Sequence, residues 1–205
     1  MSASVEEARA ALRVRQGAGA RYDAPAAPAR ELDWARRGTA YFARVLGNLA
    51  DAELAGSSAR EGFSRRQLIA FVGMQARLLA ETVAWMRRGE SDALPFTLKV
   101  SAQEVAFSAT LPPAALRYLY HHAAVHLDVE WRDATDVDWD KQIRDRSGQP
   151  IDLRQTPLAR AATLWRLAVD IGAGGRIADI PAGLRLDLKE TRAPILAWDP
   201  FGSKD

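Results

Sequence analysis

The sequence predicts an all-α protein, a four-helix bundle followed by a short irregular C-terminal extension. Two observations carry this prediction. Four long segments of the 205-residue chain repeat apolar residues at helical spacing, with loops of moderate length between them. Hydrophobic residues make up 48% of the chain and charged residues 26%, which is typical of a globular domain with a substantial core. No internal repeat is visible, so one domain is the simplest organisation.

The N-terminal part predicts a short helix, a loop and a long helix. A helix at 5–15 is expected because Ser4 and Glu7 have the spacing of a capping box. Residues 17–29 are rich in Gly, Ala and Pro, which favours a loop or an extended segment. In residues 30–50 apolar side chains recur mostly at steps of three and four, which predicts the first long helix.

The second long helix is predicted at 65–88, where the apolar face is the most continuous in the chain. Ser64 is a suitable N-cap, and Gly89 is expected to end the helix. The following segment is mixed in character, with a short helix expected near 100–108.

A third long helix is expected to begin at Pro112 and Pro113, since proline is tolerated in a first helical turn, and to run to about Glu130. Residues 133–155 predict a loop with some local structure. Within it, Ser147 and the glycine that follows it predict a turn.

The last long helix is predicted at about 157–171, with Thr156 as its N-cap, proline in its first turn and Gly172 after its end. The alternation in GLRLDL, residues 183–188, predicts a short strand. The final residues, 199–205, are expected to be frayed. The six tryptophans are interpreted as core or interface residues.

Composition excludes several classes of function. The net charge is +2, from 28 basic and 26 acidic residues, and no block of Lys and Arg of the nucleic-acid-binding type occurs. The chain has no cysteine, which excludes disulfides, thiolate metal ligands and a cysteine nucleophile. The N-terminus does not have the pattern of a signal peptide, and no stretch approaches the roughly 18 apolar residues of a membrane span. We therefore expect a cytoplasmic protein that binds neither nucleic acid nor membrane.

Three stretches of the sequence carry a resemblance to a known family. They are GFSRRQLIAFVG at 62–73, HAAVHLDVEWRD at 122–133 and TPLARAATLWRLAVDIG at 156–172. Further similarity lies in RQGAGARYDAP at 15–25 and ARRGTAYFARVL at 35–46. With these motifs in this order, the chain resembles the maleylpyruvate isomerase family, the mycothiol-dependent type of the DinB-like helical bundles. The resemblance supports a bundle domain at 1–182 and a C-terminal extension at 183–205.

The resemblance implies a fold and a chemistry. The fold is a DinB-like four-helix bundle. The chemistry is the cis–trans isomerisation of maleylpyruvate to fumarylpyruvate, assisted by a low-molecular-weight thiol and a divalent metal, usually zinc. The family holds the metal with one histidine on the second helix and a Glu-x-x-x-His pair on the fourth, and these positions correspond here to Phe71, Thr163 and Leu167. Since phenylalanine and leucine cannot ligate zinc, we expect the metal site to be absent and predict no metal cofactor.

Other candidate site residues lie in the third and fourth helices. All three histidines fall in HHAAVH at 121–126, and His122 and His126 can share a helical face. They are candidate catalytic residues in a pocket, with buried structural residues and a metal-ligand pair as the alternatives. Arg132 and Arg160 are candidates for binding a substrate carboxylate, because a guanidinium can pair with it bidentately.

Glu130 is also a candidate substrate-binding residue, although Glu130, Arg132 and Asp133 can instead form an ion-paired corner at the end of the third helix. Asp170 matches a family aspartate and is interpreted as structural. The family also holds a substrate carboxylate with an arginine after the second helix, where this chain offers only Lys99.

Three functions remain open at the level of sequence. The first is a metal-free homologue that binds a ligand or a partner protein. The second is a divergent, metal-independent isomerase or lyase acting on a small carboxylate, with His122 and His126 in its pocket. The third is a metalloprotein built on the His-x-x-x-His pair. The expected partners are a small-molecule carboxylate and, in a homodimer or heteromer, another protein chain.

Overall fold

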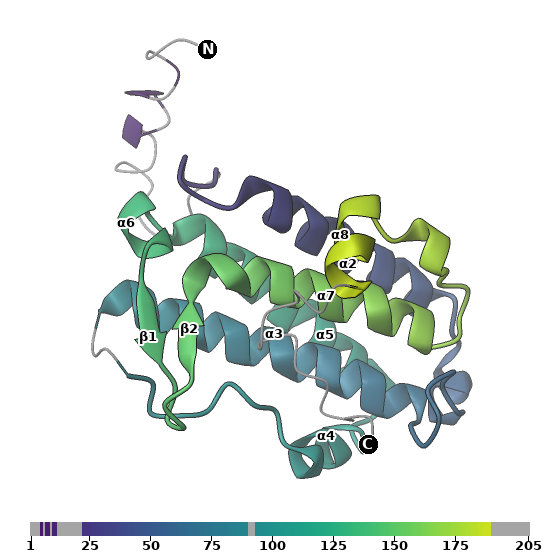
Figure 1. Ribbon diagram of the computed structural model, residues 1–205. Coiled ribbons are helices and arrows are strands. Elements are labelled where there is room, and N and C mark those ends of the chain that lie inside the picture. The colour runs from purple at the N-terminus through teal and green to yellow at the C-terminus, as the bar shows by residue number, and fades with distance from the viewer. Residues whose placement is uncertain (1–4, 6, 9, 12–21, 90–92, 190–205) are drawn as a thin grey trace.

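The computed structural model describes residues 5, 7, 8, 10, 11, 22–89 and 93–189, and the side chains of 186–189 are not described (Figure 1). Four long helices dominate the fold: α2 (Ala29–Gly47), α3 (Arg65–Arg88), α5 (Pro113–Asp133) and α7 (Thr156–Asp170). The shorter elements are η1 (Asp51–Ala55), α4 (Ala102–Ser108), α6 (Asp136–Trp139), β1 (Gln142–Arg144), β2 (Pro150–Asp152), η2 (Leu153–Gln155), η3 (Ile177–Asp179) and α8 (Ala182–Lys189). The predicted all-α bundle is confirmed. The helix expected at 5–15 lies mostly outside the described residues.

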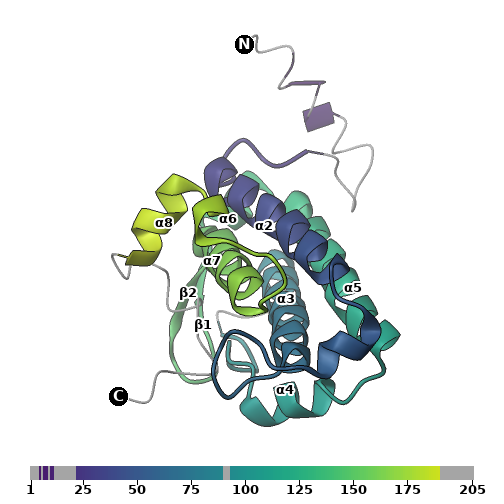
Figure 2. The same cartoon turned by 90° about the vertical axis from the view of Figure 1, so that its right-hand side faces the viewer.

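The bundle consists of two well-packed helix pairs that share one core (Figure 2). Helix α3 packs along α5, and α2 packs along α7. Glycines permit the close approach within both pairs. A Cβ atom at Gly73 would lie 2.9 Å from Leu119 Cγ, and one at Gly38 would lie 2.9 Å from Trp165 Nε1. By contrast, α2 and α5 approach each other at few positions.

Helix α3 begins and ends as the sequence predicts. The Ser64 hydroxyl accepts a hydrogen bond from the Gln67 backbone N–H at 3.3 Å, and the Gln67 side chain accepts one from the Ser64 N–H at 2.8 Å. This reciprocal pair is a capping box. At the other end Gly89 adopts φ 65°, a left-handed conformation that glycine enters without steric cost.

Helix α7 begins one residue earlier than predicted, so Thr156 is not its N-cap. The short helix η2 leads directly into α7, and Gln155 occupies the cap position. The Thr156 hydroxyl donates instead to the Leu153 carbonyl at 2.8 Å and accepts from Trp131 Nε1 at 3.0 Å. This threonine therefore ties α7 to α5. Gly172, with φ 69°, follows the end of the helix as expected.

The loop predicted between the third and fourth long helices contains a small antiparallel hairpin, in which Ile143 pairs with Ile151. Gly148 adopts φ 84° in the predicted turn. Asp145 organises the hairpin, because its carboxylate accepts hydrogen bonds from the backbone N–H groups of Ser147 and Leu98, among others. Burial raises the pKa of Asp145, but these hydrogen bonds outweigh it and lower the pKa below its usual value.

The strand predicted at 183–188 is wrong, because these residues lie within helix α8. The helix starts after Pro181, whose carbonyl accepts from the Arg185 N–H at 2.9 Å. Leu184 is fully buried, and a Cβ atom at Gly183 would lie 2.9 Å from the Trp34 ring on α2. Packing against α2 therefore decides the structure, and the short alternating pattern does not. Residues 190–205, including the tail expected to be frayed, lie outside the described residues.

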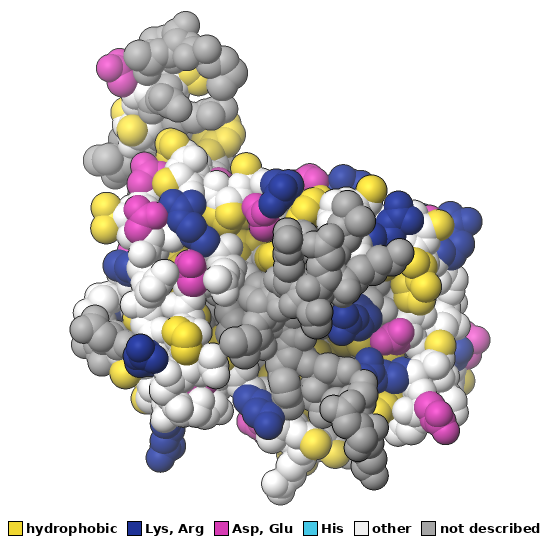
Figure 3. Space-filling view, in the orientation of Figure 1, with side chains coloured by type: hydrophobic (Ala, Val, Ile, Leu, Met, Phe, Trp, Pro, Cys, Tyr) yellow, Lys and Arg dark blue, Asp and Glu magenta, His cyan; other side chains and the backbone are white. Residues whose placement is uncertain are grey.

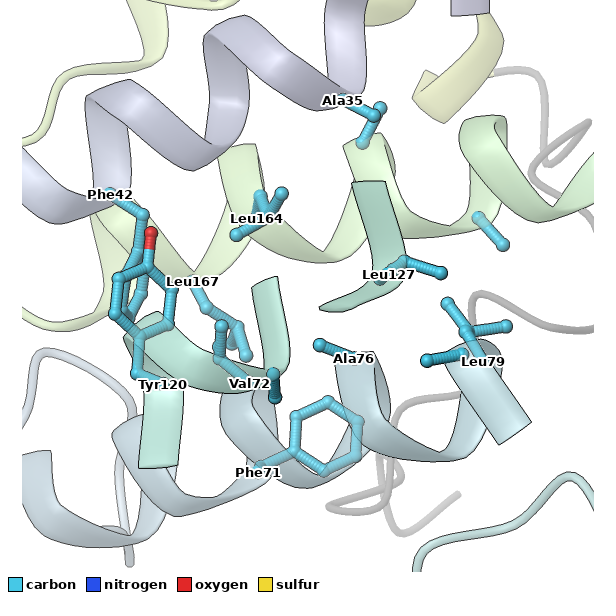
Figure 4. Packing of buried hydrophobic residues seen from close by; sticks show 14 of the residues in the cluster. Ala35, Phe42, Phe71, Val72, Ala76, Leu79, Tyr120, Leu127, Leu164 and Leu167 are labelled. Carbon is cyan, nitrogen blue, oxygen red and sulfur yellow. The ribbon is translucent and has the colours of Figure 1, made fainter. Parts of the chain in front are cut away.

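The core lies between the four long helices, which all contribute apolar side chains to it (Figure 4). Four of the tryptophans are buried, as expected: Trp34, Trp131, Trp139 and Trp165. Trp198 lies outside the described residues. Helix α3 also has the length and composition of a membrane span, contrary to our expectation, but 67% of its apolar window is buried inside the bundle. A core position accounts for this apolar character. On the face drawn in Figure 3, basic and acidic side chains are interspersed.

Candidate functional site

The positions that the family resemblance assigns to metal ligands lie in the core, on α3 and α7. Phe71, Thr163 and Leu167 have exposed fractions of 2%, 6% and 4%. The two helices run antiparallel here. The start of α3 meets the end of α7, where Arg65 Nε donates to the Ile171 carbonyl. Figure 4 shows Phe71 and Leu167 among the buried side chains.

The contact between α3 and α7 around Phe71, Thr163 and Leu167 is called the α3–α7 seam here. A hydrogen bond crosses this seam one helical turn from Phe71. Gln75 Nε2 donates to Thr163 Oγ1 at 2.6 Å, and the Thr163 hydroxyl donates to the Ala159 carbonyl at 3.2 Å. Both side chains are buried, so these bonds satisfy groups that would otherwise be costly to bury. Nowhere in the described part of the chain do three His, Asp or Glu side chains gather as a metal site would require. The seam offers one hydroxyl and one amide to a ligand, both already engaged.

Arg160 is the most buried charged side chain near the seam, with an exposed fraction of 1%. Its Nη1 donates to the Val72 carbonyl at 2.7 Å and to Gln75 Oε1 at 3.0 Å. Its Nη2 is buried and has no hydrogen-bond partner among the described residues. Burial lowers the pKa of Arg160 to about 10, and the nearby Tyr120 hydroxyl opposes this shift. Even at this pKa the guanidinium is positively charged at neutral pH.

Arg160 also lines a groove between α2 and α5, two helices that contact each other at few positions. The groove has a volume of about 390 Å³, within the range of small-molecule sites. Helix α2 contributes Arg36, Thr39, Ala40 and Ala43; α5 contributes Tyr120, His121, Ala124, Val125, Leu127, Asp128, Trp131 and Arg132. Most of this wall is apolar, and Arg160 of α7 completes it. None of the three positions assigned to metal ligands lines this groove.

The other charged residues of the groove form ion pairs with one another. Arg36 donates to Asp23 at 2.6 Å and to Asp128 at 2.7 Å, and Arg132 Nε lies 3.1 Å from the second carboxylate oxygen of Asp128. These side chains are about one-third exposed, so they lie nearer to solvent than Arg160. The predicted carboxylate-binding residues Arg132 and Arg160 thus line one groove, but only Arg160 is without a carboxylate partner among the described residues.

The candidate catalytic residues His122 and His126 lie on an exposed face of α5 rather than in this groove. The His122 ring stacks on Tyr118 with a centroid distance of 5.4 Å. His126 Nε2 lies 3.3 Å from Glu130 Oε1, and the His126 side chain is 44% exposed. The difference has a helical cause: Ala123 and Leu127 on the same helix face the core, which turns both histidines outward. His121 is the histidine that lines the groove.

Glu130 belongs to an ion-paired corner at the end of α5, as one sequence interpretation proposed, although its partners differ. Arg87 of α3 pairs with Glu130 and lies 3.5 Å from Asp133, while Arg132 pairs with Asp128 one turn earlier. Asp170, interpreted as structural, pairs with Arg60 at 3.4 Å, and its carbonyl accepts from the Ala59 N–H.

Sequence reasoning missed several groove residues on α5. Tyr120, Ala124, Leu127 and Trp131 recur at steps of four, three and four, so a helical-face reading of this segment could have grouped them. The three histidines drew attention to the neighbouring face instead.

Comparison with known proteins supports the family resemblance. A family model described as the mycothiol maleylpyruvate isomerase N-terminal domain matches residues 35–172. The crystal structure of the mycothiol-dependent maleylpyruvate isomerase is 32% identical in sequence, with a TM-score of 0.71, and a histidine-to-alanine variant of it has the same identity and a TM-score of 0.72. Each match covers 78% of this chain and 67% of the other. No protein with a curated description matches significantly.

Proposed function

Because the chain belongs to the mycothiol maleylpyruvate isomerase N-terminal domain family and has its DinB-like helical fold, we propose that it is a metal-free homologue. In this proposal it binds a small carboxylate ligand or a partner protein and does not perform the mycothiol-dependent isomerisation named for its relatives. We also propose a cytoplasmic location and no binding to nucleic acid or membrane.

The α3–α7 seam is the observation that carries this proposal. A divalent metal needs lone pairs from several side chains, and zinc takes nitrogen, sulfur or carboxylate oxygen. Phe71 and Leu167 have no such atoms, and the Thr163 hydroxyl is engaged with Gln75 and Ala159. The residues present do not fit a metal.

The proposed carboxylate ligand is supported by the arginines of the α2–α5 groove. Among the described residues Arg160 Nη2 has no hydrogen-bond partner, whereas Arg132 is already paired with Asp128. Glu130, the third residue proposed for ligand binding, has less support because its carboxylate pairs with Arg87 and would repel an anion.

The alternative, a divergent metal-independent isomerase or lyase using His122 and His126, has less support from the geometry because both rings are exposed. It would require His126→Ala to abolish turnover of a small carboxylate while the fold is retained. A metalloprotein built on these histidines would need further ligands. Among the described residues, Glu130 is the acid that contacts His126, and it is already paired with Arg87.

Elemental analysis of the untagged protein, together with an isomerase assay, tests the proposal. We expect far less than one zinc per chain and no conversion of maleylpyruvate when zinc and mycothiol are added. Robust turnover on adding zinc would overturn it. The triple variant Phe71→His, Thr163→Glu, Leu167→His is the matched control, because it restores the family's ligand types. It is expected to gain zinc binding if its circular dichroism shows a native helical content.

A homodimer or heteromer is a further part of this proposal. Tyr118 and Val125 expose 67% and 65% of their surface on α5, which would suit a protein contact. Sedimentation of the pure protein distinguishes a monomer from a dimer. A monomer at all concentrations would remove the homodimer and leave only a heteromer.

A further inference from the structure

We infer that the α2–α5 groove is a binding site for monocarboxylates with an apolar body, and that Arg160 binds the carboxylate. This inference deepens the proposed function, on which it rests, by naming the site and the class of ligand. The groove is distinct from the family's metal positions, since Phe71, Thr163 and Leu167 do not line it.

The charge of the ligand follows from Arg160. Leaving a guanidinium buried without an anion is costly, because the desolvation penalty is not repaid by a counter-charge. Among the described residues, Val72 and Gln75 satisfy Nη1, whereas Nη2 has no partner and no carboxylate pairs with the side chain. A bound anion would balance the charge of Arg160 and accept a hydrogen bond from Nη2. A carboxylate oxygen is a strong acceptor for such a bond.

The apolar body follows from the walls. The apolar part of the groove wall consists of three alanines together with Val125, Leu127 and Trp131. Such walls give favourable burial to a hydrocarbon or aromatic group and offer few hydrogen bonds to a sugar or a second charge. A phosphate or a dicarboxylate would bring extra negative charge against these apolar walls, which disfavours both.

The charged residues of the groove that lie nearer to solvent are already paired with one another and do not bind the ligand. Arg36 and Arg132 already share the carboxylate of Asp128, so neither is available to a ligand without losing an ion pair. Among the described residues, Arg160 is therefore the one arginine of the groove left to bind a carboxylate, which favours ligands with a single carboxylate group. The groove volume of about 390 Å³ limits the length of the apolar body.

Calorimetric titration with three probes, benzoate, hexanoate and 3-phenylpropionate, tests the inference. We expect at least one of them to bind. The neutral amide 3-phenylpropanamide has the shape of 3-phenylpropionate without its charge, and it should bind at least about tenfold more weakly than 3-phenylpropionate, as expected for the loss of a charge-assisted hydrogen bond. Acetate, which lacks the apolar body, is also expected to bind more weakly than the best probe. If none of the three probes binds the wild-type protein, the inference is overturned.

Two variants identify the site. Arg160→Met keeps the side-chain length but removes the charge, and should weaken binding by about 10- to 100-fold. Ala40→Phe fills the groove from its exposed α2 wall without changing Arg160, and should also abolish binding. Arg37→Met, which changes an exposed arginine of α2 that pairs with Asp33 and does not line the groove, is the matched control and should change the affinity by less than about threefold. Undiminished binding to a folded Arg160→Met protein would contradict the inference.

The outcome is separable from that of the proposed function. The titration needs neither zinc nor a thiol, so a metal-free, inactive protein that binds none of the probes retains the proposed function and loses this inference. Conversely, zinc-dependent turnover would remove the proposed function whatever the groove binds.

Discussion

The bundle contains two seams between its helix pairs, and they differ in how they are filled. The α3–α7 seam is closed by Phe71 and Leu167 and crossed by the Gln75–Thr163 hydrogen bond. The α2–α5 seam is open as a groove of about 390 Å³, with the buried Arg160 along it. In the first seam the polar groups are paired. In the second a cation is without a counter-charge among the described residues.

The difference separates stability from ligand binding. Close packing of large apolar side chains stabilises a bundle, whereas an open groove and an unpaired buried charge reduce that stability. The seam that contains the positions assigned to metal ligands is part of the core. The proposed anion site lies in the other seam, so changes in the two seams should affect different properties of the protein.

Phe71→Ala in the closed seam is expected to have the largest effect on stability. Removing a buried aromatic ring leaves a cavity, and such substitutions lower the free energy of unfolding by about 3–5 kcal/mol. Urea denaturation followed by circular dichroism measures this change. Leu167→Ala on the facing helix should cost about 2–5 kcal/mol.

Ala124→Val is the matched change in the open seam. Since Ala124 lines the groove and is only half-buried, one larger side chain should alter the free energy of unfolding by less than about 1 kcal/mol. Equal effects of Phe71→Ala and Ala124→Val would show that the two seams do not differ in packing.

Thr163→Val and Arg160→Met sharpen the comparison at the level of polar groups. Valine keeps the shape of threonine but leaves Gln75 Nε2 unpaired in the core, which should cost about 1–3 kcal/mol. Arg160→Met removes the cost of a buried cation but leaves Gln75 Oε1 without its donor, and because these two effects oppose each other the stability should stay within about 1 kcal/mol of the wild type. Thermal and urea unfolding of both variants measure the difference. A loss of several kcal/mol in Arg160→Met would show that the arginine is mainly structural.

The sequence predicted the long helices well because local signals define them. Ser64 and Gly89 bound α3 through capping interactions that depend only on nearby residues, and Pro113 starts α5 for the same reason. The strand at 183–188 was wrong because two-residue alternation over six residues is a weak signal, and packing of Leu184 and Gly183 decided the outcome. Tertiary contact overrides local pattern in such short segments.

The candidate site was predictable only in part. The family resemblance pointed to the positions of Phe71, Thr163 and Leu167, and the structure places all three in the core. Arg132 and Arg160 were also named, but the difference between them depends on tertiary contacts. Arg132 pairs with Asp128, whereas Arg160 has no carboxylate partner among the described residues. Helical spacing alone did not show that His122 and His126 face solvent, because which face of a helix is buried depends on its neighbours.

The smallest expected effect is in the titration of Tyr120, beside Arg160. Burial raises the pKa of the Tyr120 hydroxyl from 10.0 to about 12, and the positive charge of Arg160 lowers it in part. The folded protein thus keeps this proton between pH 10 and 12 while the unfolded chain loses it. The contribution to stability is complete below pH 10 and is lost as the pH rises to about 12. For Arg160, whose pKa is lowered from 12.5 to about 10, the penalty of the buried cation is complete below pH 10 and declines above it.

Difference titration of phenolate absorbance between the wild type and Tyr120→Phe isolates this hydroxyl, with circular dichroism confirming that both remain folded. We expect one phenolate with a midpoint near pH 12 to disappear in the variant. A midpoint near the ordinary value of 10.0 would show that burial does not hold the proton on Tyr120.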